Sequence, residues 1–436
     1  MSAAVKIIGA GLAGCEAAWQ LAEKGVSVEL FEMKPKRMTP AHISANFAEL
    51  VCSNSFRSNE LTNAVGLLKE EMRRLGSLII NSADQTKIPA GGALAVDRKQ
   101  FEKVITEKIR KHPYIDIIEH EVTKVPEGRV IIATGPLTSD IFADKLTELF
   151  PNEEMLKFFD SAAPIVTLES VDLDNSFYAS RYDKGDADYI NCPMDKEEYT
   201  NFRNALISSE KAPVHGFEEK LVFEGCIPIE LMAKRGEDTI RYGPLKPVGL
   251  KDPKTGKEPY AVVQLRKDNA EGTLYNLVGF QTHLKFDEQK RVFSMIPALR
   301  NADFVRYGVM HRNTYLDAPK LLDRFYRLKK EPRIGFAGQI TGVEGYVESA
   351  ASGLLAGIET AREMLNLPPI EFSGETAVGS LALYISKGAV SNFQPMNINF
   401  GIIKPLDFKV RGKRNKNLAI SERSLKLIDS YKGVLK

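Results

Sequence analysis

Cysteine is scarce in this sequence, which has four cysteines in 436 residues: Cys15, Cys52, Cys192 and Cys226. No pair has the Cys-x-x-Cys spacing of a zinc site, and the density is far below that of a small fold held together by disulfide bonds. The sequence therefore predicts no metal site and no disulfide framework, and we expect free thiols.

An excess of charge of one sign is also absent. The formal net charge is +2 with 27% charged residues, so any basic surface that could attract nucleic acid must be local. No run of eighteen apolar residues occurs, and the N-terminus enters a strand without a basic leader or a cleavage site. We expect a cytoplasmic protein that does not span a membrane, and nothing in the sequence indicates an obligate protein partner.

A glycine-rich turn near the N-terminus is the most informative feature that is present. An apolar strand runs into Gly9, Gly11 and Gly14, and a second strand ends at Glu32, eighteen residues after the last of these glycines. In dinucleotide-binding turns the first glycine permits the tight turn, and the second lets a pyrophosphate approach the backbone at a helix N-terminus. The third lets helix and strand pack closely, and the acid binds ribose hydroxyls. The pattern predicts that these four residues form a dinucleotide site.

A second glycine-rich turn lies late in the chain. Residues 334–338 are typical of a buried strand, which leads through Gly338 and Gly342 into a helix rich in alanine and glycine over about residues 347–364. An NAD domain needs one such turn, whereas many FAD-binding folds bring a later strand, turn and helix back so that backbone amides face the flavin or its phosphates. The second turn therefore favours FAD.

The chain is too long for a single core, and its middle has a different character. Strand-like pieces separated by Pro and Gly turns dominate there. We predict an α/β fold in which a Rossmann-like FAD-binding domain of the glutathione reductase type is interrupted by a smaller α+β domain. Its parts are a first FAD-binding part at 1–160, an inserted substrate domain at 161–325, and a second FAD-binding part at 326–436.

Three local patterns add detail to the first part of the chain. Residues 33–65 are irregular and polar, and long loops of this kind tend to be functional. Asp97 is predicted to cap a helix that begins at Arg98. Residues 121–125 are predicted to form a strand.

The end of the chain is locally basic. Residues 404–436 contain ten Lys or Arg against three acids, and residues 324–330 form a second basic segment with interleaved aromatic residues. Such runs bind phosphate backbones without reading base sequence, although a charge run is more often only a solvated face.

Several segments together resemble one family. Besides the first glycine turn, they are residues 48–55, 89–98, 223–230, 279–284, 307–314 and 341–351. These segments are similar to those of the TrmFO family, bacterial folate- and FAD-dependent tRNA uracil-5-methyltransferases related to the GidA/MnmG flavoproteins. The similarity spans nearly the whole chain, and the cysteine-containing segments and the His283 segment are much more specific than the first glycine turn.

The resemblance implies methylation of uridine C5 in tRNA, at position 54 of the T loop. It implies carbon from 5,10-methylenetetrahydrofolate and electrons from NADH or NADPH that pass through FAD. Cys226 is then expected to add to C6 of the uracil, and Cys52 to act as a supporting acid or base, although the two roles could be exchanged. His283 is expected at the pterin, with Arg98 and Tyr346 also on the cofactor side.

Three other functions stay open at this stage. A paralogue could methylate a uridine of ribosomal RNA by the same chemistry, since backbone contacts carry little base information. A folate-linked flavin oxidoreductase without an RNA substrate would explain both glycine turns but not the cysteines or the basic tail. A non-catalytic FAD-bearing RNA-binding protein would bind RNA without needing Cys226.

Overall fold

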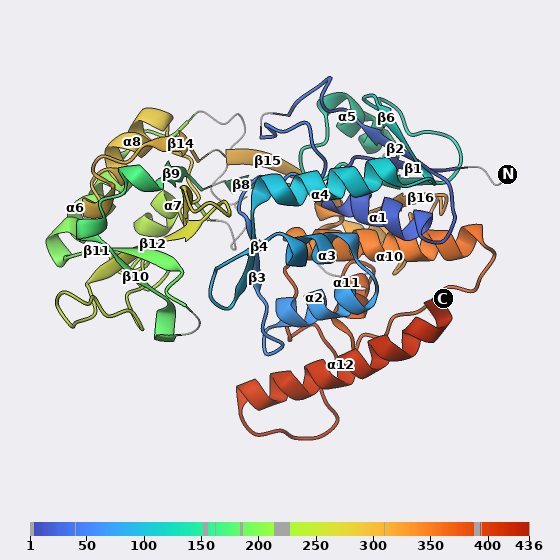
Figure 1. The fold of residues 1–436 in the computed structure, drawn as a ribbon. Coiled ribbons are helices and arrows are strands. Elements are labelled where there is room, and N and C mark those ends of the chain that lie inside the picture. The colour runs from blue at the N-terminus through green and yellow to red at the C-terminus, as the bar shows by residue number, and fades with distance from the viewer. Residues whose placement is uncertain are drawn as a thin grey trace.

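The computed structural model describes residues 4–435 except residues 40, 151–155, 162, 184–185, 213–226, 309, 388–392 and 394. Its first unit contains a five-stranded parallel sheet with the strand order β16-β7-β1-β2-β6. The strands are β1 (Val5–Ile8), β2 (Val28–Glu32), β6 (Ile115–Glu119), β7 (Val130–Ile132) and β16 (Ile334–Phe336). Late strand β16 therefore completes a sheet whose other strands all come from the first third of the chain (Figure 1).

Two helices rich in small residues lie side by side next to this sheet (Figure 1). They are α1 (Leu12–Ala22) and α10 (Tyr346–Met364). A Cβ atom at Gly353 of α10 would lie 2.2 Å from the carbonyl oxygen of Ala13, and one at Gly357 would lie 2.8 Å from that of Ala17. The alanine and glycine content of α10 therefore lets the two helix backbones approach closely, and it joins the first helix of the chain to a late one.

The other helices of this unit are α2 (Ala64–Arg74), α3 (Leu78–Gln85), α4 (Arg98–Lys111), α5 (Asp140–Glu148) and α11 (Ala377–Tyr384). A small antiparallel sheet of β3 (Ser55–Ser58), β5 (Ala93–Val96) and β4 (Lys87–Ile88) lies beside them. The predicted cap of α4 is confirmed, because the Asp97 carboxylate accepts a hydrogen bond from the Gln100 amide at 2.9 Å.

The second unit is built on a six-stranded antiparallel sheet with the order β10-β11-β12-β13-β9-β14. These strands are Phe177–Ala179, Tyr189–Met194, Ala261–Lys267, Leu274–Leu277, Ile165–Thr167 and Phe304–Arg306, in the order of the sheet. The sheet is accompanied by α6 (Lys196–Ser208), α7 (Ile229–Lys234) and α8 (Phe286–Phe293), and the unit has its own apolar core around Phe202, Phe280 and Phe293. Two antiparallel strands, β8 (Leu156–Ser161) and β15 (Met310–Tyr315), lie between the units (Figure 1).

Two sequence expectations have clear outcomes in this architecture. The α/β class with a parallel nucleotide-type sheet is confirmed. The strand expected at 121–125 is wrong: β6 ends at Glu119, and the following residues are irregular. Val122 is half-buried and lines a cavity instead of pairing with a further strand, so an apolar residue there does not mark a strand. Among the helices in the described ranges, none combines the length and the apolar character that a membrane span requires.

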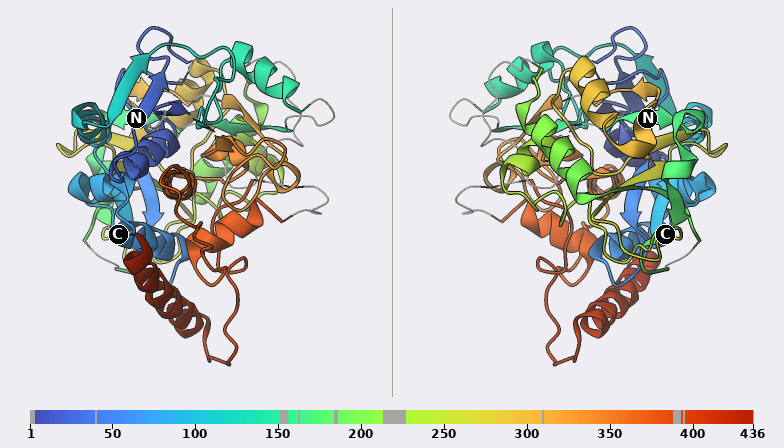
Figure 2. Two further views of the ribbon diagram at one scale, coloured as in Figure 1. Left: turned by 90° about the vertical axis from the view of Figure 1, so that its right-hand side faces the viewer. Right: turned by 90° about the vertical axis from the view of Figure 1, so that its left-hand side faces the viewer.

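The basic end of the chain forms a long helix, α12 (Lys413–Leu435), which contacts α2 and lies at the outer edge of the fold (Figure 2). The contact includes Glu71 of α2, whose carboxylate accepts a hydrogen bond from the hydroxyl of Ser424. It also accepts hydrogen bonds from the amides of Ala377 and Val378 at 2.7 and 2.8 Å, at the N-terminus of α11. One buried carboxylate therefore joins three helices, and burial raises its pKa to about 7.

The raised pKa of Glu71 predicts a pH-dependent stability. The pKa of Glu71 in the folded state lies above its ordinary value of 4.5, so the protonated side chain contributes to the stability of the fold. This contribution is complete below about pH 4.5 and is lost as the pH rises through about 7. Between pH 5 and 8 the free energy of unfolding of the wild type should fall by roughly 1–3 kcal/mol relative to that of Glu71→Gln. Urea unfolding of both proteins at several pH values measures this difference.

Glu70→Gln is the control for this experiment, because Glu70 lies on the same helix but forms partly exposed ion pairs with Arg73 and Arg74. Its unfolding free energy should follow that of the wild type across the pH range. Parallel pH profiles for Glu71→Gln and the wild type would contradict the prediction.

Candidate dinucleotide and thiol site

The first glycine turn is shaped by two close backbone approaches. Gly9 has a φ of +99°, a conformation that residues with a side chain rarely adopt. A Cβ atom at Gly14 would lie 1.8 Å from the Gly9 carbonyl oxygen, so the start of α1 can pack on the turn only through glycine. A Cβ atom at Gly11 would meet no atom within 4 Å, although Gly11 caps the same helix. The space in front of Gly11 is therefore open at a helix N-terminus, where an anion is favoured.

Glu32 lies at the carboxyl end of β2 and faces this turn. Its carboxylate accepts hydrogen bonds from the amide of Ala10 at 2.8 Å and from the amide of Lys34 at 3.0 Å. Glu32 is buried and lines the same cavity as Gly9 and Gly11. These bonds fix the carboxylate beside the glycine turn, in the position from which an acid can bind a ribose.

The cavity lies at the carboxyl ends of the parallel strands. Ile8 ends β1, Glu32 ends β2, Ala133 follows β7 and Gly338 follows β16, and all four line the cavity. This is the edge at which open α/β sheets bind their ligands. The remaining lining residues that matter below are Thr39, His42, Cys52, His120, Val122, Thr134, Gln339, Tyr346 and Ser349.

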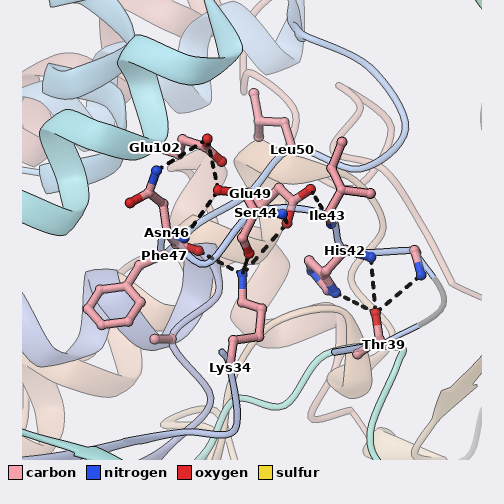
Figure 3. Close-up of polar contacts among 12 residues, drawn as sticks. Lys34, Thr39, His42, Ile43, Ser44, Asn46, Phe47, Glu49, Leu50 and Glu102 are labelled. Carbon is pink, nitrogen blue, oxygen red and sulfur yellow. Dashed lines mark hydrogen bonds and ion pairs between the residues drawn. The ribbon is translucent and has the colours of Figure 1, made fainter. Parts of the chain in front are cut away.

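The irregular stretch after β2 forms one wall of the cavity, and buried polar groups order it (Figure 3). The ammonium of Lys34 donates to the carbonyls of Ser44 and Asn46 at 3.2 and 2.6 Å and lies 3.7 Å from the carboxylate of Glu49. From α4, the Glu102 carboxylate accepts from the Ser44 hydroxyl at 3.0 Å and from the Asn46 side chain at 3.3 Å. Paired polar groups thus hold this loop in one conformation without a helix or strand.

Cys52 lies on the cavity wall, and the first residue of α10 fixes its backbone. The amides of Cys52 and Ser53 both donate to the hydroxyl of Tyr346, at 2.7 and 3.0 Å. Burial raises the pKa of Tyr346, so the hydroxyl stays neutral and accepts these bonds. The late glycine turn therefore positions a cysteine that is distant in the sequence.

The other two described cysteines are buried. Cys15 in α1 donates to the carbonyl of Ala10 at 3.3 Å, and Cys192 packs in the core of the second unit. Burial raises the pKa of both thiols, so both are neutral and unreactive at physiological pH. Cys226 lies outside the described residues. Among the thiols that the structure describes, only that of Cys52 reaches the cavity.

The two glycines of the late turn have different surroundings. Gly338, with a φ of +86°, lines the cavity, and its amide donates to the hydroxyl of Ser352 at 2.6 Å. Gly342 does not line the cavity. A Cβ atom there would lie 2.4 Å from the ring of Phe393, so packing against that ring already requires glycine.

Arg98 and His283 also lie away from the cavity wall. Arg98 donates to the carbonyls of Leu50 and Val51, directly before Cys52, and so supports the loop. His283 is buried in the second unit, where its amide donates to the Glu230 carboxylate at 2.9 Å. Burial lowers the pKa of the His283 ring, which favours a neutral imidazole.

Sequence reasoning missed several lining residues, namely Thr39, His42, His120, Thr134, Gln339 and Ser349. Thr39 and His42 belong to the irregular stretch of residues 33–65, and the length of this stretch was the only feature of the sequence that pointed to a functional role. Their side chains face each other at 2.6 Å, between Oγ1 and Nδ1 (Figure 3).

The parallel sheet, its two glycine turns and the cavity between them define a Rossmann-like fold of the FAD-binding class. The family model described as glucose inhibited division protein A matches residues 4–368. A methylenetetrahydrofolate–tRNA-(uracil-5-)-methyltransferase TrmFO of Acetivibrio thermocellus is 59% identical over 428 residues, which cover 98% of both chains. The protein of the same name from Bacillus licheniformis is 58% identical over 435 residues, with all of both chains covered. This chain therefore belongs to the TrmFO family, within the wider GidA group.

A solved structure supports the fold. The crystal structure of Aquifex aeolicus GidA in its form II crystal superposes with a TM-score of 0.69 at 16% sequence identity, and the match covers 99% of this chain and 75% of that one. At this identity the likeness concerns the fold alone. It supports the same overall arrangement of elements.

Proposed function

We propose that this protein methylates C5 of uridine 54 in the T loop of tRNA, with 5,10-methylenetetrahydrofolate as the carbon donor. FAD binds in the cavity between the two glycine turns, and NADH or NADPH supplies the electrons in the cytoplasm. The observation that carries the proposal is the thiol of Cys52 on the wall of a dinucleotide cavity. The names of the full-length relatives support the substrate and the carbon donor.

The thiols have a chemical purpose in this reaction. C5 of uracil is a poor nucleophile until a nucleophile adds to C6, and a thiolate does this well. We assign the addition to Cys226 and the removal of the C5 proton to Cys52, which Tyr346 holds at the cavity. The exchanged assignment is the alternative. The bound FAD would supply the carbon-carrying and hydride chemistry.

The remaining site residues bind the cofactors or shape the turns and loops around them. Gly9, Gly11 and Gly14 receive the pyrophosphate at the start of α1, and Glu32 binds the ribose next to it. Gly338 and Gly342 shape the late turn, Arg98 supports the Cys52 loop, and His283 serves the folate side. RNA must present its uridine unstacked, because a base inside a folded loop cannot reach the cavity.

The test is the transfer of labelled carbon from methylenetetrahydrofolate to unmodified tRNA, with NAD(P)H present. The comparison is a tRNA in which cytidine replaces the T-loop uridine, together with ribosomal RNA. Label is expected only in the tRNA that carries the uridine. No label in any RNA, from a protein that still holds flavin and oxidises NAD(P)H, would refute the proposal, and label in ribosomal RNA alone would favour the paralogue.

For the RNA backbone, we propose the start of α12 rather than the segment 324–330. Lys413, Arg414 and Lys416 are exposed. In the other segment, Arg324 forms an ion pair with Glu371 and Arg327 one with Asp323, so two of its four positive charges are paired within the protein.

Replacing Lys413, Arg414 and Lys416 together by alanine should weaken tRNA binding several-fold. The slope of the logarithm of the affinity against the logarithm of the salt concentration should also become shallower by about 2–3, because each phosphate contact releases about one counterion. Filter binding at several salt concentrations measures both effects. A matched control replaces three exposed lysines elsewhere, Lys103, Lys111 and Lys124, and should leave the slope unchanged. Equal losses in the two variants would argue against a specific role for α12.

A further inference from the structure

Three arginines converge on the loop that carries Cys52, and we refer to Arg98, Arg266 and Arg306 as the arginine cluster. They lie on α4, β12 and β14 and thus come from both units of the protein. In the sequence they are separated by 40 residues or more, so only the fold brings them together.

Arg98 contacts the loop on the N-terminal side of Cys52. Its Nη1 donates to the carbonyls of Leu50 and Val51, and its Nε donates to the carboxylate of Asp268 at 3.0 Å. Its Nη2 is buried without a hydrogen-bond partner among the described residues. Part of this cation therefore remains available to an anion.

Arg266 contacts the loop on the C-terminal side of Cys52. Its Nη2 donates to the hydroxyl of Ser53 at 2.8 Å, and its Nε donates to the side-chain oxygen of Asn54 at 3.1 Å. The side chain of Asn54 in turn donates to the carbonyl of Lys267 at 2.8 Å. Arg266 is buried, and burial lowers its pKa.

Arg306 is the third member of the cluster and lies at the end of β14. It is half-buried, and negative charge on Tyr346 or Cys52 would raise its pKa. Burial lowers its pKa, and the neighbouring charge of Arg98 lowers it further. Arg306 is therefore a cation held close to another cation.

The cluster carries more positive than negative charge. Within the described ranges, Asp268 is the carboxylate that forms an ion pair with it. Of the other ionisable groups nearby, Tyr189 and Tyr346 are neutral because burial raises their pKa. The carboxylate of Glu49 is directed to Lys34, and that of Asp97 accepts bonds from the amides of Gln100 and Ala270. A buried excess of positive charge favours a nearby anion.

We propose that the arginine cluster keeps the thiol of Cys52 ionised at neutral pH, with each arginine acting as a positioning residue through Cys52. The thiolate is then ready to take the C5 proton, or to add to C6 if the cysteine roles are exchanged. The use of this thiolate rests on the proposed function, but its ionisation does not.

The test measures ionisation in the flavin-loaded protein without RNA or folate. Iodoacetamide pulses between pH 5.5 and 9.5, followed by digestion and mass spectrometry, give the alkylation rate of the Cys52 peptide. We expect a midpoint at least about one pH unit below the value near 8.5 of an unperturbed thiol. Arg306→Met should raise the midpoint by about one pH unit, and Arg306→Lys should restore it. Arg300→Met, at an exposed arginine of the same segment, should leave it unchanged.

A second readout is independent of reagent access and of the folding of any arginine variant. The absorbance of the wild type at 240 nm minus that of Cys52→Ala follows thiolate formation with pH. A wild-type midpoint at or above about 8.5 would overturn the proposal, as would a folded, flavin-bound Arg306→Met with an unchanged midpoint. If Cys52 ionises with an ordinary midpoint while RNA methylation is normal, only the role of the arginine cluster is refuted. If the midpoint of Cys52 ionisation is low but no methylation occurs, only the proposed function is refuted.

Discussion

Cys52→Ala is expected to lower the rate of carbon transfer to tRNA by roughly 10²–10⁴-fold, the range over which a positioned acid or base contributes. Flavin binding should not change, because the substitution keeps the backbone amide of Cys52, which donates to the hydroxyl of Tyr346 and so anchors this loop. The measurement is a single-turnover assay with labelled methylenetetrahydrofolate and saturating tRNA.

Two further cysteine variants make this experiment decisive. Cys192→Ala also removes a thiol, but from the core of the second unit, and should keep the rate within a few-fold of the wild type. Cys226→Ala should abolish methylation while flavin reduction by NAD(P)H continues. Full activity of Cys52→Ala together with an inactive Cys226→Ala would assign all thiol chemistry to Cys226.

Gly14→Ala and Gly11→Leu should both abolish flavin binding, but for different reasons. The added Cβ at position 14 would lie 1.8 Å from the Gly9 carbonyl, so α1 must move away from the turn, and the fold should lose at least about 1–3 kcal/mol. The side chain at position 11 would meet open space within the protein and would instead occupy the place of the pyrophosphate.

Flavin absorbance per polypeptide and the melting temperature of the flavin-free proteins separate the two effects. Gly11→Leu should melt like the flavin-free wild type, and Gly14→Ala should melt clearly below it. A flavin-bound Gly11→Leu would show that the phosphates lie elsewhere, and an unchanged melting temperature for Gly14→Ala would refute the packing argument.

Local sequence patterns predicted the parts of this protein that depend on local contacts. The first glycine turn, the Asp97 cap and the late strand-turn-helix were predictable because each is encoded by neighbouring residues whose backbone requirements are specific. The strand expected at 121–125 failed because a strand needs a partner, and the sheet ends at β6.

The candidate site was less predictable, because distant residues create most of it. Gly342 belongs to a recognisable turn, yet the ring of Phe393 packs in the space where its side chain would be. The order of the loop after β2 depends in part on a buried lysine, Lys34, and an isolated lysine in a sequence gives no sign of burial. Arg98 and Arg266 contact the loop on either side of Cys52, and only the fold shows this because the three residues are far apart in the sequence.

The pairing of β16 with β7 and the packing of α10 on α1 also have a consequence for synthesis on the ribosome. About 200 residues separate β7 from β16, so at 5–20 residues per second the early strands wait roughly 10–40 s for their last neighbour. During that time the small-residue side of α1 is uncovered, and the second unit, which is encoded in between, has time to fold first. The cavity can be completed only after α10 has left the ribosome. Flavin loading is thus a late event in the biogenesis of this enzyme.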